Sequence, residues 1–156
     1  MQFFRFFASQ YNGGHFMKLL LLLATVLLSG CVPNTKSDPI TYGYLDVESQ
    51  LIDWCDIFSQ PEDSYSVYFY SVTCGHCAEI KQSILSYYFL NKEVMYFSKT
   101  SEETVFGTKT DLIGVSNLED FHIFGTPFLI NVTNHMVSNY YAGVSEITNY
   151  IEKNTK

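Results

Sequence analysis

Two cysteines separated by two residues, in the segment Cys74-Gly75-His76-Cys77, are the side chains of this sequence best suited to chemistry. Thiols at this spacing can pass reversibly between a dithiol and a disulfide and so exchange electrons with cysteines of another protein. A partly protonated His76 would stabilise a thiolate at Cys74 and make the disulfide more oxidising. We therefore expect Cys74 and Cys77 to be catalytic, with Gly75 and His76 tuning the redox potential.

The flanking sequence predicts a strand before this segment and a helix after it. Residues 66–72 are β-branched and aromatic, as in a buried strand. After Cys77, apolar residues recur at helical spacing until about Asn91. The first sulfur then lies at a helix N-terminus, where unpaired N–H groups and the helix dipole favour negative charge. Such sites lower a cysteine pKa from about 8.5 to roughly 3.5 to 7.5, so Cys74 should attack and Cys77 should resolve the mixed disulfide.

An inert structural disulfide and half of a zinc site are the alternatives for this pair. Zinc needs four ligands, usually from two such pairs or from one pair with spaced histidines. The residues that could help follow no recognisable spacing, and we expect no metal site; they are Cys55, His76, His122 and His135. Cys55 lies on the apolar face of a predicted helix, so we expect it to be a buried small residue and not a third redox group.

The strand and the cysteine segment together resemble the active-site region of the thioredoxin superfamily. Residues 67–77 are the first landmark of this resemblance, which covers about residues 48–156, and the Gly75-His76 spacer is similar to that of protein disulfide isomerases. A second resemblance lies in residues 124–130, which contain Thr126-Pro127 where the family has a cis-proline facing the active-site sulfur. The resemblance implies that Thr126 and Pro127 bind the extended chain of the substrate.

The sequence also departs from the family pattern near the cysteines. Thr73 stands where many thioredoxins have a tryptophan, and no helix-kinking proline follows Cys77. Tyr68 stands where thioredoxin has a buried acid that assists deprotonation of the second cysteine. These differences make efficient thioredoxin-like reduction doubtful and leave the dithiol chemistry intact.

The order of predicted elements indicates an α/β fold with a central mixed β-sheet and helices on both faces, and the resemblance implies the thioredoxin-like, three-layer form of this fold. Two strands flank the turn Thr133-Asn134-His135, and Ser145 should cap a closing helix. The other expected elements are helices over residues 47–58 and 112–121, and strands over residues 94–97, 128–132 and 136–141.

The first thirty residues predict an export signal. Lys18 precedes an apolar run of ten residues, Leu19 to Leu28, which is short for a membrane span of roughly 20. The segment Leu28-Ser29-Gly30-Cys31 resembles a bacterial lipobox, which implies cleavage and lipidation of Cys31. We also expect translation to start at Met17, because several phenylalanines precede the basic residue. The expected organisation is a signal region (1–30), the lipidated cysteine with a tether (31–40) and a thioredoxin-like domain (41–156).

The charge of the chain restricts its partners. The full sequence carries a formal charge of −7. Cleavage before Cys31 would remove Arg5 and Lys18, which leaves seven basic and sixteen acidic residues and a formal charge of −9. So acidic a surface argues against nucleic-acid partners and requires lipid, not charge, to hold the protein at a membrane. The sequence therefore predicts a monomer anchored by lipid to the extracytoplasmic face of a bacterial cell membrane.

Two functions of different classes follow. The first is a thiol–disulfide oxidoreductase that exchanges disulfides with the thiols of exported proteins, without a dissociable cofactor because the Cys74–Cys77 disulfide is the redox group. A membrane or extracytoplasmic redox partner must then recharge the pair. The second is a thioredoxin-fold binding or accessory lipoprotein, for example in peptide or bacteriocin export, in which the disulfide only braces a loop. The sequence does not choose between oxidation, reduction and isomerisation.

Overall fold

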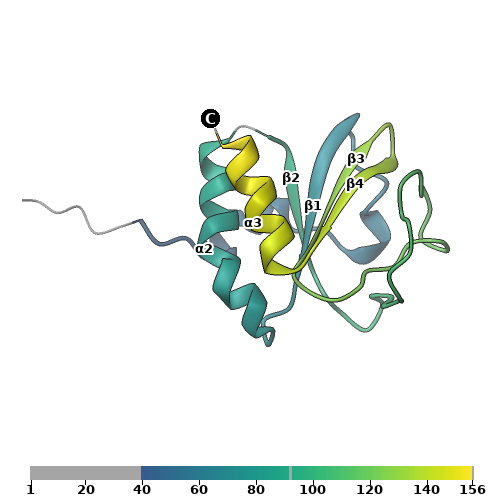
Figure 1. The fold of residues 1–156 in the computed structure, drawn as a ribbon. Coiled ribbons are helices and arrows are strands. Elements are labelled where there is room, and N and C mark those ends of the chain that lie inside the picture. Colours follow the sequence, from purple (N-terminus) through teal and green to yellow (C-terminus); the bar gives the residue numbers. More distant parts are fainter. Residues whose placement is uncertain (1–39, 92, 156) are drawn as a thin grey trace, which may run out of the picture. The chain divides into compact units, whose positions relative to one another are not determined.

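The fold is seen in a computed structural model that describes residues 40–91 and 93–155 (Figure 1). The predicted signal region, the start at Met17, Cys31 and most of the tether lie outside the described residues. Within the described part, no helix has both the length and the apolar character needed to cross a membrane. The elements in chain order are the 3-10 helices η1 (Tyr44–Gln50) and η2 (Trp54–Asp56), β1 (Ser64–Tyr70), α2 (Gly75–Leu90), β2 (Met95–Lys99), β3 (Phe128–Thr133), β4 (Met136–Ala142) and α3 (Gly143–Asn154).

The four strands form one mixed sheet in the order β2-β1-β3-β4. β1 runs parallel to β2 and antiparallel to β3, and β3 and β4 form an antiparallel hairpin. The two turn residues of this hairpin, Asn134 and His135, have positive φ angles of 50° and 60°, a conformation that asparagine tolerates well. The predicted mixed sheet and the strand-helix-strand unit before the hairpin are confirmed.

β1 lies in the middle of the sheet and is buried on both faces, as its continuous run of aromatic and β-branched residues requires. Because side chains alternate along a strand, Tyr68 and Tyr70 face one side and Val67 and Phe69 face the other. All four are at most 3% exposed. This strand therefore joins two hydrophobic clusters and leads directly to the cysteine segment.

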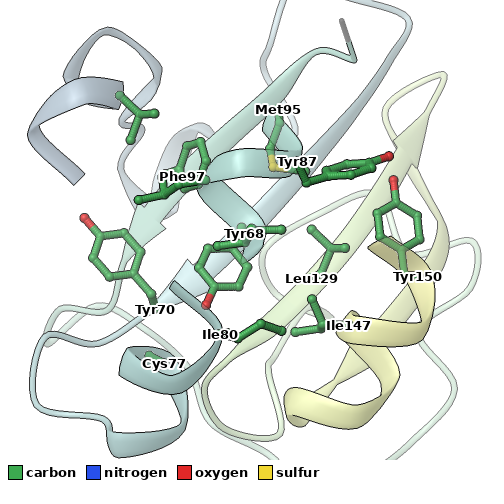
Figure 2. Packing of buried hydrophobic residues seen from close by; sticks show 13 residues of the cluster. Tyr68, Tyr70, Cys77, Ile80, Tyr87, Met95, Phe97, Leu129, Ile147 and Tyr150 are labelled. Carbon is green, nitrogen blue, oxygen red and sulfur yellow. The ribbon is translucent and has the colours of Figure 1, made fainter. Parts of the chain in front are cut away.

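One face of the sheet is covered by α2 and α3, which lie side by side (Figure 1). α2 buries Cys77, Ile80 and Ile84 at three- and four-residue spacing, so its first turn is held down at the active-site cysteine. Ile147 of α3 and Leu129 of β3 complete the same cluster (Figure 2). Rotation of α2 would expose this stripe, and the position of Cys77 is therefore set by core packing.

Among the described residues, the opposite face is covered by one helical turn, η2, and by the irregular segment 100–127. Trp54 and Ile57 pack there against Phe69 of β1. From the irregular segment, Leu112 and Phe121 are each 1% exposed. The fold class is confirmed, and on this face the helical layer is reduced to one 3-10 turn and buried loop residues.

The helix predicted over residues 47–58 is wrong. Val47 packs on the α2 face, whereas Trp54 packs on the opposite face, so the chain must cross the edge of the sheet between them. It does so at Leu51, which bridges to Phe97, and the N–H of Ile52 donates to the Phe97 carbonyl at 3.0 Å. One straight helix cannot bury residues on both faces. Cys55 consequently lies exposed on η2, and its predicted burial is also wrong.

The helix predicted over residues 112–121 is wrong as well. The N–H of Gly114 donates to the Val137 carbonyl of β4, and the N–H of Val137 donates to the Val115 carbonyl, both at 2.8 Å. The side chain of Asn117 accepts from the N–H of Asp120 at 2.9 Å. The segment thus finds its backbone partners on the edge strand and in a local turn, which replace the bonds of a helix.

The remaining boundaries agree with the predicted elements to within three residues. α2 ends where the N–H of Asn91 donates to the Tyr87 carbonyl. α3 begins at Gly143, before the expected cap Ser145, and the N-cap residue Ala142 donates its N–H to the Glu146 carboxylate at 2.8 Å. Gly143 has φ 78°, a conformation that glycine adopts without steric cost.

Candidate active site

Cys74 lies in the junction between the end of β1 and the start of α2. The N–H of Cys74 donates to the Ser71 carbonyl at 3.3 Å, and the hydroxyls of Ser71 and Thr73 lie 3.1 Å apart. This compact turn presents Cys74 partly exposed at the end of the sheet. Gly75 and His76 are also exposed, so the segment forms part of the surface.

The sulfur of Cys74 is the N-cap of α2. The N–H of Cys77 donates to Cys74 Sγ at 3.2 Å, and the N–H of Ala78 donates to the Cys74 carbonyl at 3.1 Å. A cap side chain normally offers an oxygen to these unpaired N–H groups, and here a sulfur takes that place. The helix dipole also favours negative charge at this position. The backbone is therefore arranged to receive a thiolate at Cys74.

Thr126 and Pro127 approach the same sulfur from a distant part of the chain. The bond between them is cis, as the family resemblance implies. The Cys74 thiol donates to the Thr126 carbonyl at 3.2 Å. Strand register explains this contact: Phe128, the first residue of β3, pairs with Phe69 near the end of β1, so the residues just before Phe128 lie beside the cysteine junction.

The two cysteines differ in their tendency to ionise. Burial opposes ionisation of Cys74, but hydrogen bonds from the Cys77 thiol, from the Thr126 side chain and from backbone N–H groups outweigh it and hold the pKa of Cys74 below its ordinary value. Burial raises the pKa of Cys77, and its hydrogen bond to Cys74 raises it further. Cys77 is 2% exposed. The geometry thus provides an accessible, acidic thiol and a buried, protonated one within hydrogen-bond reach.

Tyrosines line the buried side of Cys77. Tyr44 of η1 stacks on Tyr70 with ring centroids 3.8 Å apart, and Tyr68 lies in the same cluster. The hydroxyls of Tyr44 and Tyr68 are buried and have no hydrogen-bond partner among the described residues. In the sequence, Tyr68 stands out only as a departure from the family pattern. Tyr44 lies thirty positions before Cys74, and no local signal predicts its place at this site.

The other residues considered as metal ligands do not join the cysteines. The ring of His122 lies between the Thr110 hydroxyl at 3.2 Å and the Thr108 carbonyl at 3.0 Å. His135 Nδ1 lies 3.1 Å from the Phe58 carbonyl. Within residues 40–91 and 93–155, no three His, Cys, Asp or Glu side chains are grouped to hold a metal ion.

Comparison with solved structures returns thioredoxins. The chain is similar to thioredoxin f2 of Chlamydomonas reinhardtii, at 17% identity over 66% of this chain and 90% of that one, with a TM-score of 0.48. It is also similar to the thioredoxin NaTrxh of Nicotiana alata, at 15% identity over 77% and 99%, with a TM-score of 0.45. The oxidised thioredoxin of Plasmodium falciparum is 21% identical over 65% of this chain and 88% of that one, with a TM-score of 0.43. No family model and no curated protein matches the chain.

The sheet and the site define the class of the molecule. The molecule has a thioredoxin-like α/β fold. Its sheet has the strand order β2-β1-β3-β4, a cysteine pair lies at the β1–α2 junction, and a cis-proline precedes β3. A cysteine pair in this setting suits thiol–disulfide redox chemistry.

Proposed function

We propose that the protein is a thiol–disulfide oxidoreductase that is anchored to a membrane by lipid and exchanges disulfides with exported proteins. The observation that carries the redox part is the position of Cys74 Sγ, which accepts the Cys77 N–H at the start of α2 and lies 3.2 Å from the Thr126 carbonyl. An inert structural disulfide has no need of a helix N-terminus that stabilises a thiolate.

The exchange proceeds in two balanced steps. When the protein acts as a reductant, the Cys74 thiolate attacks one sulfur of the partner's disulfide, forms a mixed disulfide and releases the other partner sulfur as a thiolate, which takes a proton from solvent. Cys77 then loses its proton to solvent and attacks Cys74 Sγ. The Cys74–Cys77 disulfide forms, and the second partner thiolate leaves and is protonated. Oxidation of a partner dithiol is the reverse sequence.

The proposed partner chain would lie beside the cysteines. A pocket of about 240 Å³ adjoins the cis-proline loop, and an extended peptide crossing it would pass the exposed edge of Cys74. The backbone of Thr126 would guide this peptide, which is the role that the resemblance implies. The pocket is lined by Phe124, Gly125, Thr126, Pro127, Ala142 and Gly143.

Trapping of partners tests the redox proposal. In the full chain, Cys77→Ser should accumulate disulfide-linked partners in cells, because the mixed disulfide on Cys74 is no longer resolved. The matched control is Cys74→Ser, which should trap none. Both variants should carry Cys55→Ser, since the exposed Cys55 thiol can form adventitious disulfides. Equal labelling of the two variants, or none in either, would contradict the proposal and favour the binding-module alternative.

The direction of exchange is given by the reduction potential of the pair. A value near −120 mV corresponds to an oxidase and one near −270 mV to a reductase, on the scale of known dithiol proteins. Equilibration of the purified full chain with glutathione or dithiothreitol mixtures measures it. An oxidase needs a membrane or extracytoplasmic oxidant to recharge the pair, and a reductase needs an electron donor.

The membrane location is proposed from the sequence around Cys31. Labelling of cells with a radioactive fatty acid should mark the wild-type chain and leave Cys31→Ser unmarked. The variant should also move from the membrane to the soluble fraction, because two or three acyl chains are needed for stable anchorage. A Cys31→Ser chain that remains membrane-bound would contradict lipid anchoring.

A further inference from the structure

The two unpaired hydroxyls beside Cys77 are unusual for a buried site. Tyr68 is fully buried, and Tyr44 Oη is buried although its ring is partly exposed. Neither hydroxyl has a hydrogen-bond partner among the described residues other than the weak interaction of the two hydroxyls with each other. Buried polar groups in folded proteins are nearly always hydrogen-bonded, because losing water without replacement costs free energy. Two adjacent exceptions at one site therefore point to a partner that forms during function.

The geometry directs this pair toward the second cysteine. Tyr68 projects from β1 toward α2, and Figure 2 shows its hydroxyl turned toward the helical turn that carries Cys77. Tyr44 reaches the same cluster from η1, held by its stack on Tyr70. Burial raises the pKa of the Tyr68 and Tyr44 hydroxyls. Negative charge on Cys77 and on Cys74 raises the pKa of both hydroxyls further.

A phenol held protonated in this way can donate a hydrogen bond but cannot accept a proton. The group that must become negative in the resolving step is Cys77, whose pKa is raised by burial and by Cys74. The main causes of the pKa shifts of the two cysteines are burial and hydrogen bonds, and none of them is a carboxylate. In the described part of the chain, the buried side of Cys77 thus offers its nascent thiolate phenols and no carboxylate among its main influences, and the two phenols have no acceptor other than each other.

We propose that the hydroxyls of Tyr68 and Tyr44 are positioning groups for the resolving step, in which they donate hydrogen bonds, directly or through one buried water, to the Cys77 sulfur as it becomes a thiolate. The proton of Cys77 goes to solvent, and the phenols keep theirs. This inference rests on the proposed exchange activity and assigns the residues that assist its second step.

All elements packed around Cys77 bear on its ionisation. η1 contributes Tyr44, and β1 contributes Tyr68 and Tyr70. α2 itself contributes Cys74, exposed His76, and Lys81, whose Nζ lies 5.2 Å from the Tyr44 ring centroid. From the cis-proline loop, the Thr126 side chain lowers the pKa of Cys77, as does a backbone hydrogen bond with Ser71, but burial outweighs both.

The two steps of exchange can be measured separately in one reaction. The test uses the full chain in detergent with Cys31→Ser and Cys55→Ser, so that Cys74 and Cys77 are its only thiols. The reduced protein is mixed with the aromatic disulfide 5,5′-dithiobis(2-nitrobenzoate) in a stopped-flow instrument. Release of the first thionitrobenzoate reports attack by Cys74, and release of the second reports resolution by Cys77.

Tyr68→Phe should slow the second release by about tenfold, the typical effect of losing one hydrogen bond to a charged group, and leave the first unchanged. The apparent pKa of the second phase should move upward. Tyr44→Phe should act in the same direction. The matched control is Tyr141→Phe, which should change neither phase, because Tyr141 lies against Tyr150 with ring centroids 4.7 Å apart and lines an open pocket with Lys153.

A merely structural pair gives a different pattern. Removing an unpaired buried hydroxyl should then stabilise the chain and leave both phases and their pH profiles unchanged, and this result in Tyr68→Phe and in the double variant Tyr44→Phe/Tyr68→Phe would overturn the inference. A wild-type chain without a second release would overturn the proposed function as well. A normal second release that the variants do not alter would remove only the role of the phenols.

Discussion

Two groups of tyrosines lie on the same face of the sheet, and they solve the problem of a buried hydroxyl in opposite ways. At the end away from the active site, Tyr87 and Tyr150 both donate to the Glu93 carboxylate, at 2.6 and 3.0 Å. At the active-site end, the hydroxyls of Tyr44 and Tyr68 have no partner in the described part of the chain. Tyr68, Tyr87 and Tyr150 belong to one buried hydrophobic cluster (Figure 2), and Tyr44 packs against it.

The difference lies in where negative charge is available. Glu93 is a permanent acceptor, so Tyr87 and Tyr150 are satisfied in every state of the protein and tie α2 and α3 to the loop before β2. At the other end, among residues 40–91 and 93–155, the acceptor that can become negative beside these phenols is the Cys77 sulfur. Hydrogen bonds to Glu93 stabilise the fold at all times. The hydroxyls of Tyr44 and Tyr68 can stabilise the protein in the same way only when a thiolate forms beside them.

The largest effect on activity is expected from substitution of Cys74. Cys74→Ser, in the Cys55→Ser background, should reduce the rate of insulin reduction by dithiothreitol to that seen without protein, because the attacking thiolate is lost. The Cys55→Ser chain alone is the control and should retain full activity. Residual catalysis by the Cys74→Ser variant would mean that another thiol carries the reaction.

Loss of the hydrogen bonds from Tyr87 and Tyr150 to Glu93 should change the stability of the protein and not its activity. Glu93→Gln removes the charged acceptor of two phenols and should lower the free energy of unfolding by about 1 kcal/mol, the low end for such bonds since Glu93 is exposed. Chemical denaturation measures the change, and the exchange rate should stay at the wild-type value. The comparison between the two ends fails if Glu93→Gln slows exchange or leaves the denaturation midpoint unmoved.

The acidity of Cys74 should depend on its neighbour. The Cys77 thiol donates to Cys74, so Cys77→Ala should raise the pKa of Cys74 toward the ordinary thiol value. Alkylation by iodoacetamide as a function of pH, in the Cys55→Ser background, gives the midpoint directly. We expect the midpoint below that of a free thiol when Cys77 is present and higher in the variant. Identical midpoints would show that the helix N-terminus alone sets this acidity.

The smallest effect concerns Tyr96, another phenol paired with a carboxylate. Burial and a 2.7 Å hydrogen bond to Glu62 raise the pKa of Tyr96 from 10.0 to about 12. The stabilising contribution of this group is complete below pH 10, where the phenol is neutral in both states. It declines from pH 10 to about 12, because the unfolded chain ionises first. Tyr96→Phe should make the loss of stability over this range shallower, as measured by urea denaturation; an unchanged slope would contradict the assignment.

Prediction from the sequence succeeded where the signal was local. β1 and α2 were foreseen because a run of aromatic and β-branched residues or a stripe at helical spacing can be recognised within one segment. The segments 47–58 and 112–121 failed for the opposite reason. Their backbone groups pair with Phe97 and Val137, which belong to strands far away in the chain, and no periodicity within the segments reveals this.

The same division applies to the candidate site. The sequence pattern placed Cys74 at a helix N-terminus, and the structure shows its sulfur as the N-cap. The contact with Thr126 was implied only by family resemblance, and the contribution of Tyr44 was missed. Cys55 was expected inside the core and lies on the surface, because the chain crosses the sheet edge just before it.

By itself, the sequence determined which residues can do chemistry, the strand and helix that flank them, and the acidic character of the whole chain. Tertiary structure alone decided which distant groups surround the two sulfurs: Thr126 through the pairing of β3 with β1, and Tyr44 through the crossing of the sheet edge. Capping and periodicity act over a few residues and are visible in the sequence, whereas the partner of a buried hydroxyl or an edge backbone group is chosen by the packing of the whole domain.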